Sequence, residues 1–377
     1  MSLSIAEVTV LIITIAFGFL VVIFLIQALL RKRYAWALFS SLFFGFLAGF
    51  AAILGELNFS GDNIFQVFAR SLHLNLYGLH FFFFYIFFER LVSNKPNPVR
   101  LSIMVALLLT QTIGLWLVFY FEVNAMNSEI AWVLADIGYW TPALLVYLGF
   151  GVPIYIKTYL YTKEIKAIVL CVALIFVSIG FVISMINDLY FILDVFKIDV
   201  NAPDLIAELS EVANIFPSIG VILFVATYLI NLDYVYRLPN DNYLLMVLTN
   251  DGNPIHSINL KTRKDIEIKD LLLSGMIYAI NSVFKEILQR QNTITSINSE
   301  GINIIIEQGE EIVALVITDR VTYFLNQGLK RYAKIFEKSF KKELGRKEQN
   351  ILVYDKAIDL LKSIFPFFIV EDKEPKE

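Results

Sequence analysis

Long runs of apolar residues alternate with short polar stretches along the chain before Leu238. A membrane-spanning helix needs about 20 apolar residues to cross about 30 Å of hydrocarbon. The runs of that length are Val8–Leu30, Ala35–Gly55, Ile64–Phe88, Leu101–Phe121, Ile130–Ile156, Ala167–Ile192 and Leu205–Leu232. We therefore predict an α-helical membrane bundle of seven transmembrane helices over residues 1–237.

The periodicity changes after Leu238 and becomes that of a small α+β domain. Two strands, Tyr243–Thr249 and Ile255–Leu260, flank the turn signal Asn250-Asp251-Gly252-Asn253. The segment Lys269–Gln289 has apolar residues at spacings of three and four, which is typical of an amphipathic helix. We expect the buried side of this helix to consist of Leu272, Met276, Ala279, Val283 and Ile287.

Further alternating and helical segments complete the predicted domain. A strand at Thr293–Asn298, a hairpin of Ile302–Gln308 and Ile312–Thr318, and helices at Thr322–Leu344 and Asp355–Ile364 follow in order. The order β-β-α-β-β-β-α-α predicts a five-stranded antiparallel sheet over residues 238–366, with helices on one or both faces. The charged tail, residues 367–377, is predicted to be disordered.

The order and texture of these segments resemble a longin or roadblock domain of the profilin-like class over Asn242–Ile364. The segments concerned are YLLMVLTNDGNPIHSINL, KDLLLSGMIYAINSVFKEIL and INIIIEQGEEIVALVIT. A PAS-like sensor domain is the nearest alternative, but its helices are expected mostly between the early strands and the final hairpin. The resemblance implies non-catalytic work, namely dimerisation through sheet edges or helices and binding of small GTPases or their regulators. It carries over no site residues.

Charge along the chain predicts how the bundle is oriented. Basic residues near the membrane favour the cytoplasmic side, and one set of connecting segments carries nine of them against one, Lys197, in the other set. The nine are Arg31, Lys32, Arg33, Arg90, Lys95, Arg100, Lys157, Lys163 and Lys166. We therefore predict a multi-pass protein of the cell membrane with its N-terminus outside and its C-terminal domain in the cytoplasm.

Composition agrees with a membrane protein and limits the chemistry available to it. Hydrophobic residues make up 57% of the chain and charged residues 18%, whereas soluble domains carry about 25% charged residues. A net charge of −4 argues against nucleic acid as a partner. The single cysteine, the absence of a lysine in Leu205–Leu232 for a retinal Schiff base, and the absence of a phosphate-binding loop lead us to expect no enzyme, cofactor or metal site.

Ionisable residues inside the predicted spans are the strongest candidates for a functional site, because charge in hydrocarbon is costly. Arg70, His73, Tyr77 and His80 share one face of the third span at spacings of three and four. Asp136, Asp188, Glu208 and Glu211 lie in the predicted outer halves of other spans. One interpretation is an outward-facing pocket for a cation or a proton, with Arg70 paired to an acid. The other is a structural ion-pair network near the interface.

A basic face on the segment Thr322–Leu344 is the second candidate. Opposite the apolar side of this predicted helix lie Lys330, Arg331, Lys334, Lys338, Lys341 and Lys342. They form either a solvated face or a contact with the anionic inner leaflet, where each basic side chain contributes about 1 kcal/mol.

Three functions fit these features. The first is a receptor or sensor whose bundle relays its state to the longin-like domain, through the segment Asp233–Pro239 that follows the last span. The second is a membrane-anchored scaffold in which the bundle only locates the domain. The third is a proton- or cation-coupled transporter with a regulatory domain.

Overall fold

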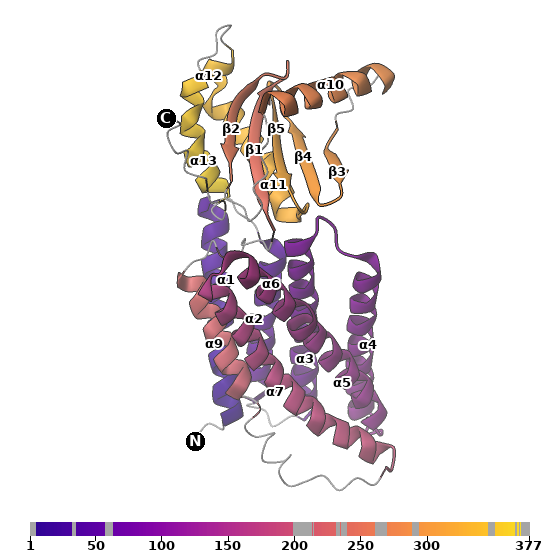
Figure 1. The fold of residues 1–377 in the computed structure, drawn as a ribbon. Helices are drawn as coiled ribbons and strands as arrows, with labels where there is room; N and C mark the ends of the chain where they lie inside the picture. Colours follow the sequence, from indigo (N-terminus) through magenta and orange to yellow (C-terminus); the bar gives the residue numbers. More distant parts are fainter. Residues whose placement is uncertain are drawn as a thin grey trace. The chain divides into compact units, whose positions relative to one another are not determined.

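The computed structural model describes residues 5–31, 35–56, 63–198, 213, 215–230, 234, 240–260, 270–288, 294–345, 351–365, 368 and 370. The chain divides into two compact units (Figure 1). One unit comprises Met1–Glu89 with Pro96–Val235, and the other comprises Arg90–Lys95 with Tyr236–Glu377. The boundary near residue 236 lies close to the predicted start of the C-terminal domain at 238.

The first unit is a helical bundle. Its helices are α1 (Ile5–Arg31), α2 (Trp36–Glu56), α3 (Asn63–Val92), α4 (Pro98–Val123), α5 (Glu129–Leu144), α6 (Val152–Thr162), α7 (Ile165–Val195) and α9 (Ile215–Ile230), with a π-helical segment η1 (Leu145–Gly151) joining α5 to α6. Many of their large apolar side chains are exposed, among them Ile15 at 62% and Ile130 at 68%. Exposed apolar helices of this kind are compatible with contact to a lipid bilayer.

Six helical stretches of the described residues are long and apolar enough to cross a membrane. They are Val8–Ile26, Trp36–Gly55, Ile64–Val92, Pro98–Val123, Glu129–Thr162 and Ile165–Leu193. The prediction of a membrane protein with spanning helices is therefore confirmed for six of the seven spans. The seventh, predicted at Leu205–Leu232, is described only as α9, whose 16 residues are apolar but short, and residues 199–212 lie outside the described part.

Small residues allow neighbouring helices of the bundle to approach closely. A β-carbon added at Gly138 of α5 would lie 2.5 Å from the backbone nitrogen of Gln111 on α4, and one at Gly114 of α4 would lie 2.7 Å from that of Ala135. Glycine at these positions brings the backbones of α4 and α5 into direct contact, a packing mode common between membrane helices.

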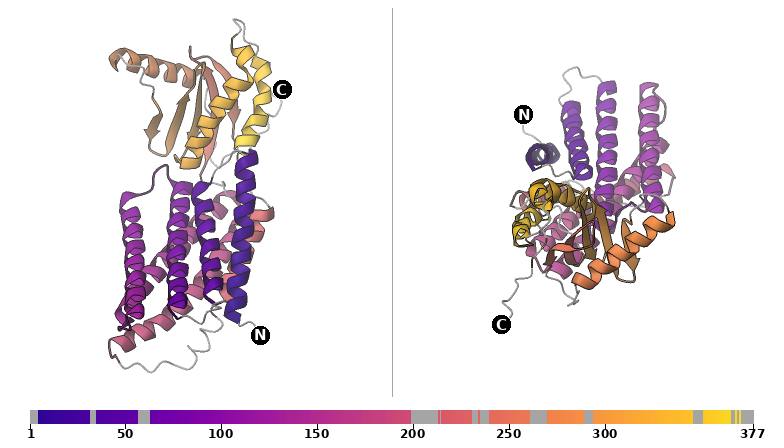
Figure 2. Two further views of the ribbon diagram at one scale, coloured as in Figure 1. Left: turned by 180° about the vertical axis from the view of Figure 1, so that it is seen from behind. Right: turned by 90° about the horizontal axis from the view of Figure 1, so that it is seen from above.

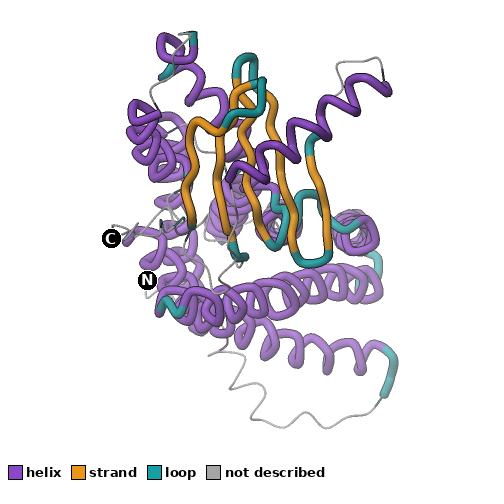
Figure 3. Tube along the Cα trace, turned by 45° about the horizontal axis from the view of Figure 1, so that its top comes forward, coloured by secondary structure: helices purple, strands orange, loops and turns teal. Residues whose placement is uncertain are grey.

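The second unit is built on an antiparallel sheet of five strands, as predicted. The strands are β1 (Asn242–Thr249), β2 (Pro254–Asn259), β3 (Ser296–Ser299), β4 (Ile302–Gln308) and β5 (Ile312–Thr318). Their order across the sheet is β2-β1-β5-β4-β3 (Figure 3). The central strand β5 is buried along its whole length, whereas β3 at one edge is short and largely exposed.

Helices cover both faces of this sheet (Figure 2). Leu273 and Ile277 of α10 (Asp270–Leu288) pack with Leu244 and Met246 of β1 on one face. Because side chains alternate along a strand, the intervening residues of β1 point to the other face. The helix α11 (Tyr323–Ser339) covers this face, and α13 (Ala357–Ile364) packs against α11. Along the sequence, α12 (Lys341–Leu344) and a 3-10 helix, η3 (Ile351–Lys356), separate α11 from α13.

The predicted orientation of α10 is wrong. Its buried side chains in the first three turns are Leu273, Ser274 and Ile277, whereas Leu272, Met276, Ala279 and Val283 are exposed. The burial of the side chain of Ile287 is not described. Residues on two sides of this helix are apolar, so helical periodicity alone did not distinguish the side that the sheet covers from the side that it leaves open.

Two further boundaries differ from the predicted ones. The helix predicted at Thr322–Leu344 is interrupted at Phe340, and Thr322 caps it, with its hydroxyl accepting from the backbone nitrogen of Leu325 at 3.3 Å. Beyond residue 366, Phe368 stacks on Phe365 and Val370 pairs with Leu260, so these two residues of the predicted tail pack on the domain. Residues 371–377 lie outside the described part.

Candidate functional site

The polar residues of α3 lie along one face of this helix and meet partners from other helices of the bundle. His80 is 2% exposed. Its Nδ1 lies 2.8 Å from the backbone oxygen of Ser41 on α2, and its Nε2 lies 2.8 Å from the hydroxyl of Tyr147 on η1. A carbonyl oxygen only accepts, so Nδ1 carries a proton. Burial among apolar rings favours the neutral imidazole, in which the Tyr147 hydroxyl donates to Nε2 and both nitrogens have partners.

Ser41 completes this network. Its hydroxyl lies 2.9 Å from Nδ1 of His80 and donates to the backbone oxygen of His80 at 3.0 Å. Aromatic rings surround the imidazole, including those of Phe17 at 5.3 Å and Phe84 at 5.7 Å between centroids. Polar atoms that are buried in apolar surroundings need such partners, and the network joins α2, α3 and η1.

Tyr147 belongs to the π-helical segment. Pro142 precedes this segment and removes a backbone donor from α5. Single π-helical turns inside α-helices are frequently found at functional sites. The structure thus places the hydroxyl that binds His80 on an irregular stretch of backbone.

His73 and Tyr77 lie nearer the N-terminal end of α3. The Nδ1 of His73 lies 2.8 Å from the backbone oxygen of Ala48 on α2, and the ring of Tyr77 meets His73 edge-on at 4.9 Å. Tyr77 also contacts His80, at 6.0 Å between centroids. These residues form one continuous series of ring contacts from His73 to His80.

Arg70 and two of the predicted acids, Asp136 and Asp188, lie near one another in the bundle. The guanidinium of Arg70 lies 4.4 Å from the ring centroid of Trp132 on α5. The indole nitrogen of Trp140 donates to Asp188 on α7 at 2.6 Å. Asp136 is within electrostatic range of both Asp188 and Arg70. Among the described residues, however, Arg70 makes no direct ion pair with an acid; it is exposed and stacks on an indole instead.

Two predicted site residues, Glu208 and Glu211, lie outside the described residues. No group of three metal-ligating side chains occurs within the part of the chain that the structure describes. Sequence reasoning missed Ser41, Trp132, Trp140 and Tyr147, which supply the partners of the predicted residues. For Tyr147 a signal was available, because Pro142, Gly149, Gly151 and Pro153 cluster around it.

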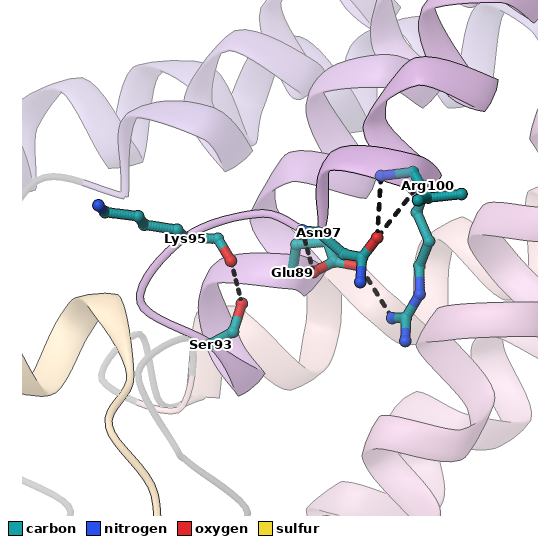
Figure 4. Close-up of polar contacts among 6 residues, drawn as sticks. Glu89, Ser93, Lys95, Asn97 and Arg100 are labelled. Carbon is teal, nitrogen blue, oxygen red and sulfur yellow. Dashed lines mark hydrogen bonds and ion pairs between the residues drawn. The ribbon is translucent and has the colours of Figure 1, made fainter. Parts of the chain in front are cut away.

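The C-terminal end of α3 carries a buried charge, Glu89. Its side chain is 3% exposed, and its carboxylate accepts from Arg100 at 3.0 Å and from the backbone nitrogen of Asn97 at 3.3 Å (Figure 4). Asn97 caps α4 by accepting from the backbone nitrogens of Val99 and Arg100. These contacts hold the end of α3 against the start of α4.

Arg90–Lys95, which directly follow Glu89, belong to the second unit. The backbone oxygen of Ser93 accepts from the backbone nitrogen of Tyr323, at the start of α11, at 3.2 Å. The guanidinium of Arg90 lies 4.2 Å from the ring centroid of Tyr323. Among the described elements, α3 is therefore the one that has residues in both units.

The surface of the second unit offers two candidate contact areas. The first is the open side of α10, where Leu271 is 81% and Leu272 77% exposed. The second is the predicted basic face, of which Lys330, Lys334, Lys338, Lys341 and Lys342 are exposed and Arg331 is half-buried. Burial raises the pKa of the Glu307 carboxyl, and the nearby charge of Lys330 opposes that shift.

Comparisons of this chain with protein-family models, with curated proteins and with solved structures return no match.

Proposed function

We propose that this chain is a receptor or sensor whose membrane bundle controls a longin-like domain that binds a cytoplasmic protein. The observation that carries the proposal is the course of α3 (Asn63–Val92). This helix bears Arg70, His73 and His80, and its last turn belongs to the unit that contains the sheet. A displacement of α3 would reach α11 through Arg90 and Tyr323 without passing through another helix.

The route through α3 differs from the predicted route through Asp233–Pro239, most of which lies outside the described residues. Bistable packed elements are the usual carriers of such shifts. The buried network around His80 supports a functional role for α3, because it ties the helix to the π-helical segment η1, an irregularity that is frequent at functional sites.

The proposed partner is a small GTPase or its regulator, or a second copy of this domain. The open side of α10 supports a protein contact, since contiguous exposed apolar side chains mark interaction surfaces. An antiparallel sheet of five strands with helices on both faces suits the longin-like resemblance. Because the chain has no phosphate-binding loop, nucleotide would belong to the partner. The orientation proposed from the charge asymmetry places this unit in the cytoplasm, where the basic face would contact the anionic leaflet.

The test is affinity capture with the full-length protein in nanodiscs, read by mass spectrometry. Small GTPases or their regulators should be recovered with the wild type and lost with the double variant Met276→Glu/Val283→Glu. Lys362→Glu, an exposed change on α13, is the matched control and should recover the same partner.

Arg70→Glu tests control by the bundle. The sensor predicts changed recovery of the partner by Arg70→Glu at equal expression, because α3 would lose its stacking on Trp132. Unchanged recovery would favour the scaffold, in which the bundle only anchors the domain. Proton or cation flux in proteoliposomes that disappears with Asp188→Asn would favour the transporter instead.

A further inference from the structure

The open side of α10 is apolar and free of charge over several turns. No residue from Leu271 to Val283 is acidic or basic, and Leu272, Met276 and Val283 are exposed on this side. A helix at the surface of a globular domain usually carries charged residues opposite its buried side. Their absence here indicates that the open side of α10 is a contact surface.

The middle of this side is a shallow strip. A β-carbon added at Gly275 would meet no atom within 4 Å, and the small side chain of Ala279, one turn further along, is exposed. Helical geometry places Leu272 and Met276 on one flank of the strip and Tyr278 on the other. A second helix can lie along such a strip, between the larger side chains of the two flanks.

Two acidic turns border the flank that carries Tyr278. The turn between β1 and β2 touches α10, since a β-carbon added at Gly252 would lie 2.7 Å from the β-carbon of Tyr278. The turn between β4 and β5 is bonded to the first turn, because the amide nitrogen of Asn250 donates to the backbone oxygen of Glu310 at 2.8 Å. Asp251 and Glu310 are exposed, and neither turn contains a basic residue. Among the described residues, no ion pair involves either carboxylate.

The apolar strip and the acidic turns together select among the occupants that α10 could bind. The acids would repel an anionic lipid surface, and an isologous contact with a second copy would supply only further acids from the same turns. A basic protein segment gains from the charges that oppose these two occupants.

We propose that the open side of α10 binds an amphipathic helix of another protein. The apolar side of that helix lies on Gly275 and Ala279, and its lysine or arginine residues face Asp251 and Glu310. This inference rests on the proposed function only in that the second unit binds a protein, and it specifies the chemistry of that partner.

The experiment uses the full chain in nanodiscs of phosphatidylcholine, a zwitterionic lipid, and two fluorescent peptides of about 18 residues, long enough to form a helix. Both peptides have leucines on one side; one carries lysines beside the leucines, and the other carries glutamates at the same positions. Fluorescence anisotropy, corrected for binding to empty nanodiscs, should show that the wild type binds the lysine peptide about tenfold more tightly.

Variants test the two parts of the surface separately. Asp251→Lys/Glu310→Lys should reverse the preference, because the turns then attract glutamate and repel lysine. Met276→Glu should weaken the binding of both peptides, since it places a charge in the apolar contact. Asp355→Lys/Asp359→Lys makes the same change of net charge at exposed positions of η3 and α13, and it should keep the wild-type preference.

Cys171 shows whether each variant is folded. It is the single cysteine and is buried, so its reaction with a maleimide fluorophore reports unfolding on heating. An unchanged preference in folded Asp251→Lys/Glu310→Lys would overturn the proposal, as would a wild type that binds neither peptide. Neither result would bear on the sensor function, which is judged by capture of the partner and by its response to Arg70→Glu.

Discussion

The hydroxyl of Tyr147 lies 2.8 Å from Nε2 of His80, although the two residues are 67 positions apart in the chain. The bond connects the middle of α3 to the π-helical segment, and both side chains are buried, at 5% and 2% exposed. The other ring nitrogen, Nδ1, is hydrogen-bonded to Ser41. The hydroxyl of Tyr147 is therefore the hydrogen-bond donor that Nε2 of the neutral imidazole needs.

Tyr147→Phe should therefore destabilise the bundle. The substitution keeps the ring but leaves a buried acceptor without a donor, which costs about 1–3 kcal/mol. We expect a lower unfolding temperature, measured through the maleimide reaction of Cys171. Tyr120→Phe is the control, since Tyr120 is 57% exposed, and its effect should stay within about 0.5 kcal/mol. Equal effects of the two changes would mean that the His80 bond does not stabilise the fold.

Gly138→Leu should disrupt the packing of α4 against α5. A β-carbon at Gly138 would lie 2.5 Å from the backbone nitrogen of Gln111, so the helices must separate, and overpacking of this kind costs about 1–3 kcal/mol or more. The measurement is the yield of monodisperse protein and its unfolding temperature. Gly149→Ala meets only Leu145, at 3.8 Å, and should behave like the wild type; a normal yield for Gly138→Leu would contradict the close approach.

Glu337→Ala should loosen the hairpin between β4 and β5. The carboxylate of Glu337 accepts from the backbone nitrogens of Glu311 at 2.8 Å and Ile312 at 3.3 Å, and hydrogen bonds to a charged group are worth about 1.5–3 kcal/mol. Hydrogen exchange of residues 302–318, read by mass spectrometry, should become faster. Glu300→Ala, at an exposed position, is the control, and identical exchange in both variants would exclude this role for Glu337.

The second unit should lose stability as pH rises through the folded pKa of Asp319. Burial, and then the negative charge of Asp241, raise the pKa of the Asp319 carboxyl above its ordinary 3.8. On acidification the folded unit therefore binds the proton before the unfolded chain does. This contribution to stability is fully present below pH 3.8, declines as pH rises from there through the folded pKa, and is lost above it.

Asp319→Asn should reduce this pH dependence and raise stability at neutral pH. The amide oxygen can still accept from the backbone nitrogen of Asp241, as Oδ1 does now at 3.1 Å. The measurement is the protection of β1 and β5 amides from exchange between pH 3.5 and pH 7, corrected for intrinsic rates, over roughly the range in which carboxyl groups titrate. If protection from exchange in Asp319→Asn falls with pH as steeply as in the wild type, other groups control the pH dependence of stability.

Several features followed from sequence alone because they depend on local periodicity. Runs of about 20 apolar residues located six helices that can span a membrane. Alternating residues and the turn at Asn250–Asn253 predicted β1 and β2, and the hairpin of β4 and β5 was predicted at Ile302–Gln308 and Ile312–Thr318, as the structure has it. The side of α3 that carries Arg70, His73 and His80 also followed from spacing.

Tertiary structure decided what these elements meet. Spacing could not show that Ser41 and Tyr147 satisfy His80, or that Arg70 stacks on Trp132, because those partners are far away in the chain. Sequence spacing also predicted the wrong side of α10 as the buried one, because residues on both sides of that helix are apolar. Only the contact with β1 determines that Leu273 and Ile277 are buried. Local patterns determine which segments form helices and strands; the choice among equally apolar faces and the pairing of distant polar groups require the packed fold.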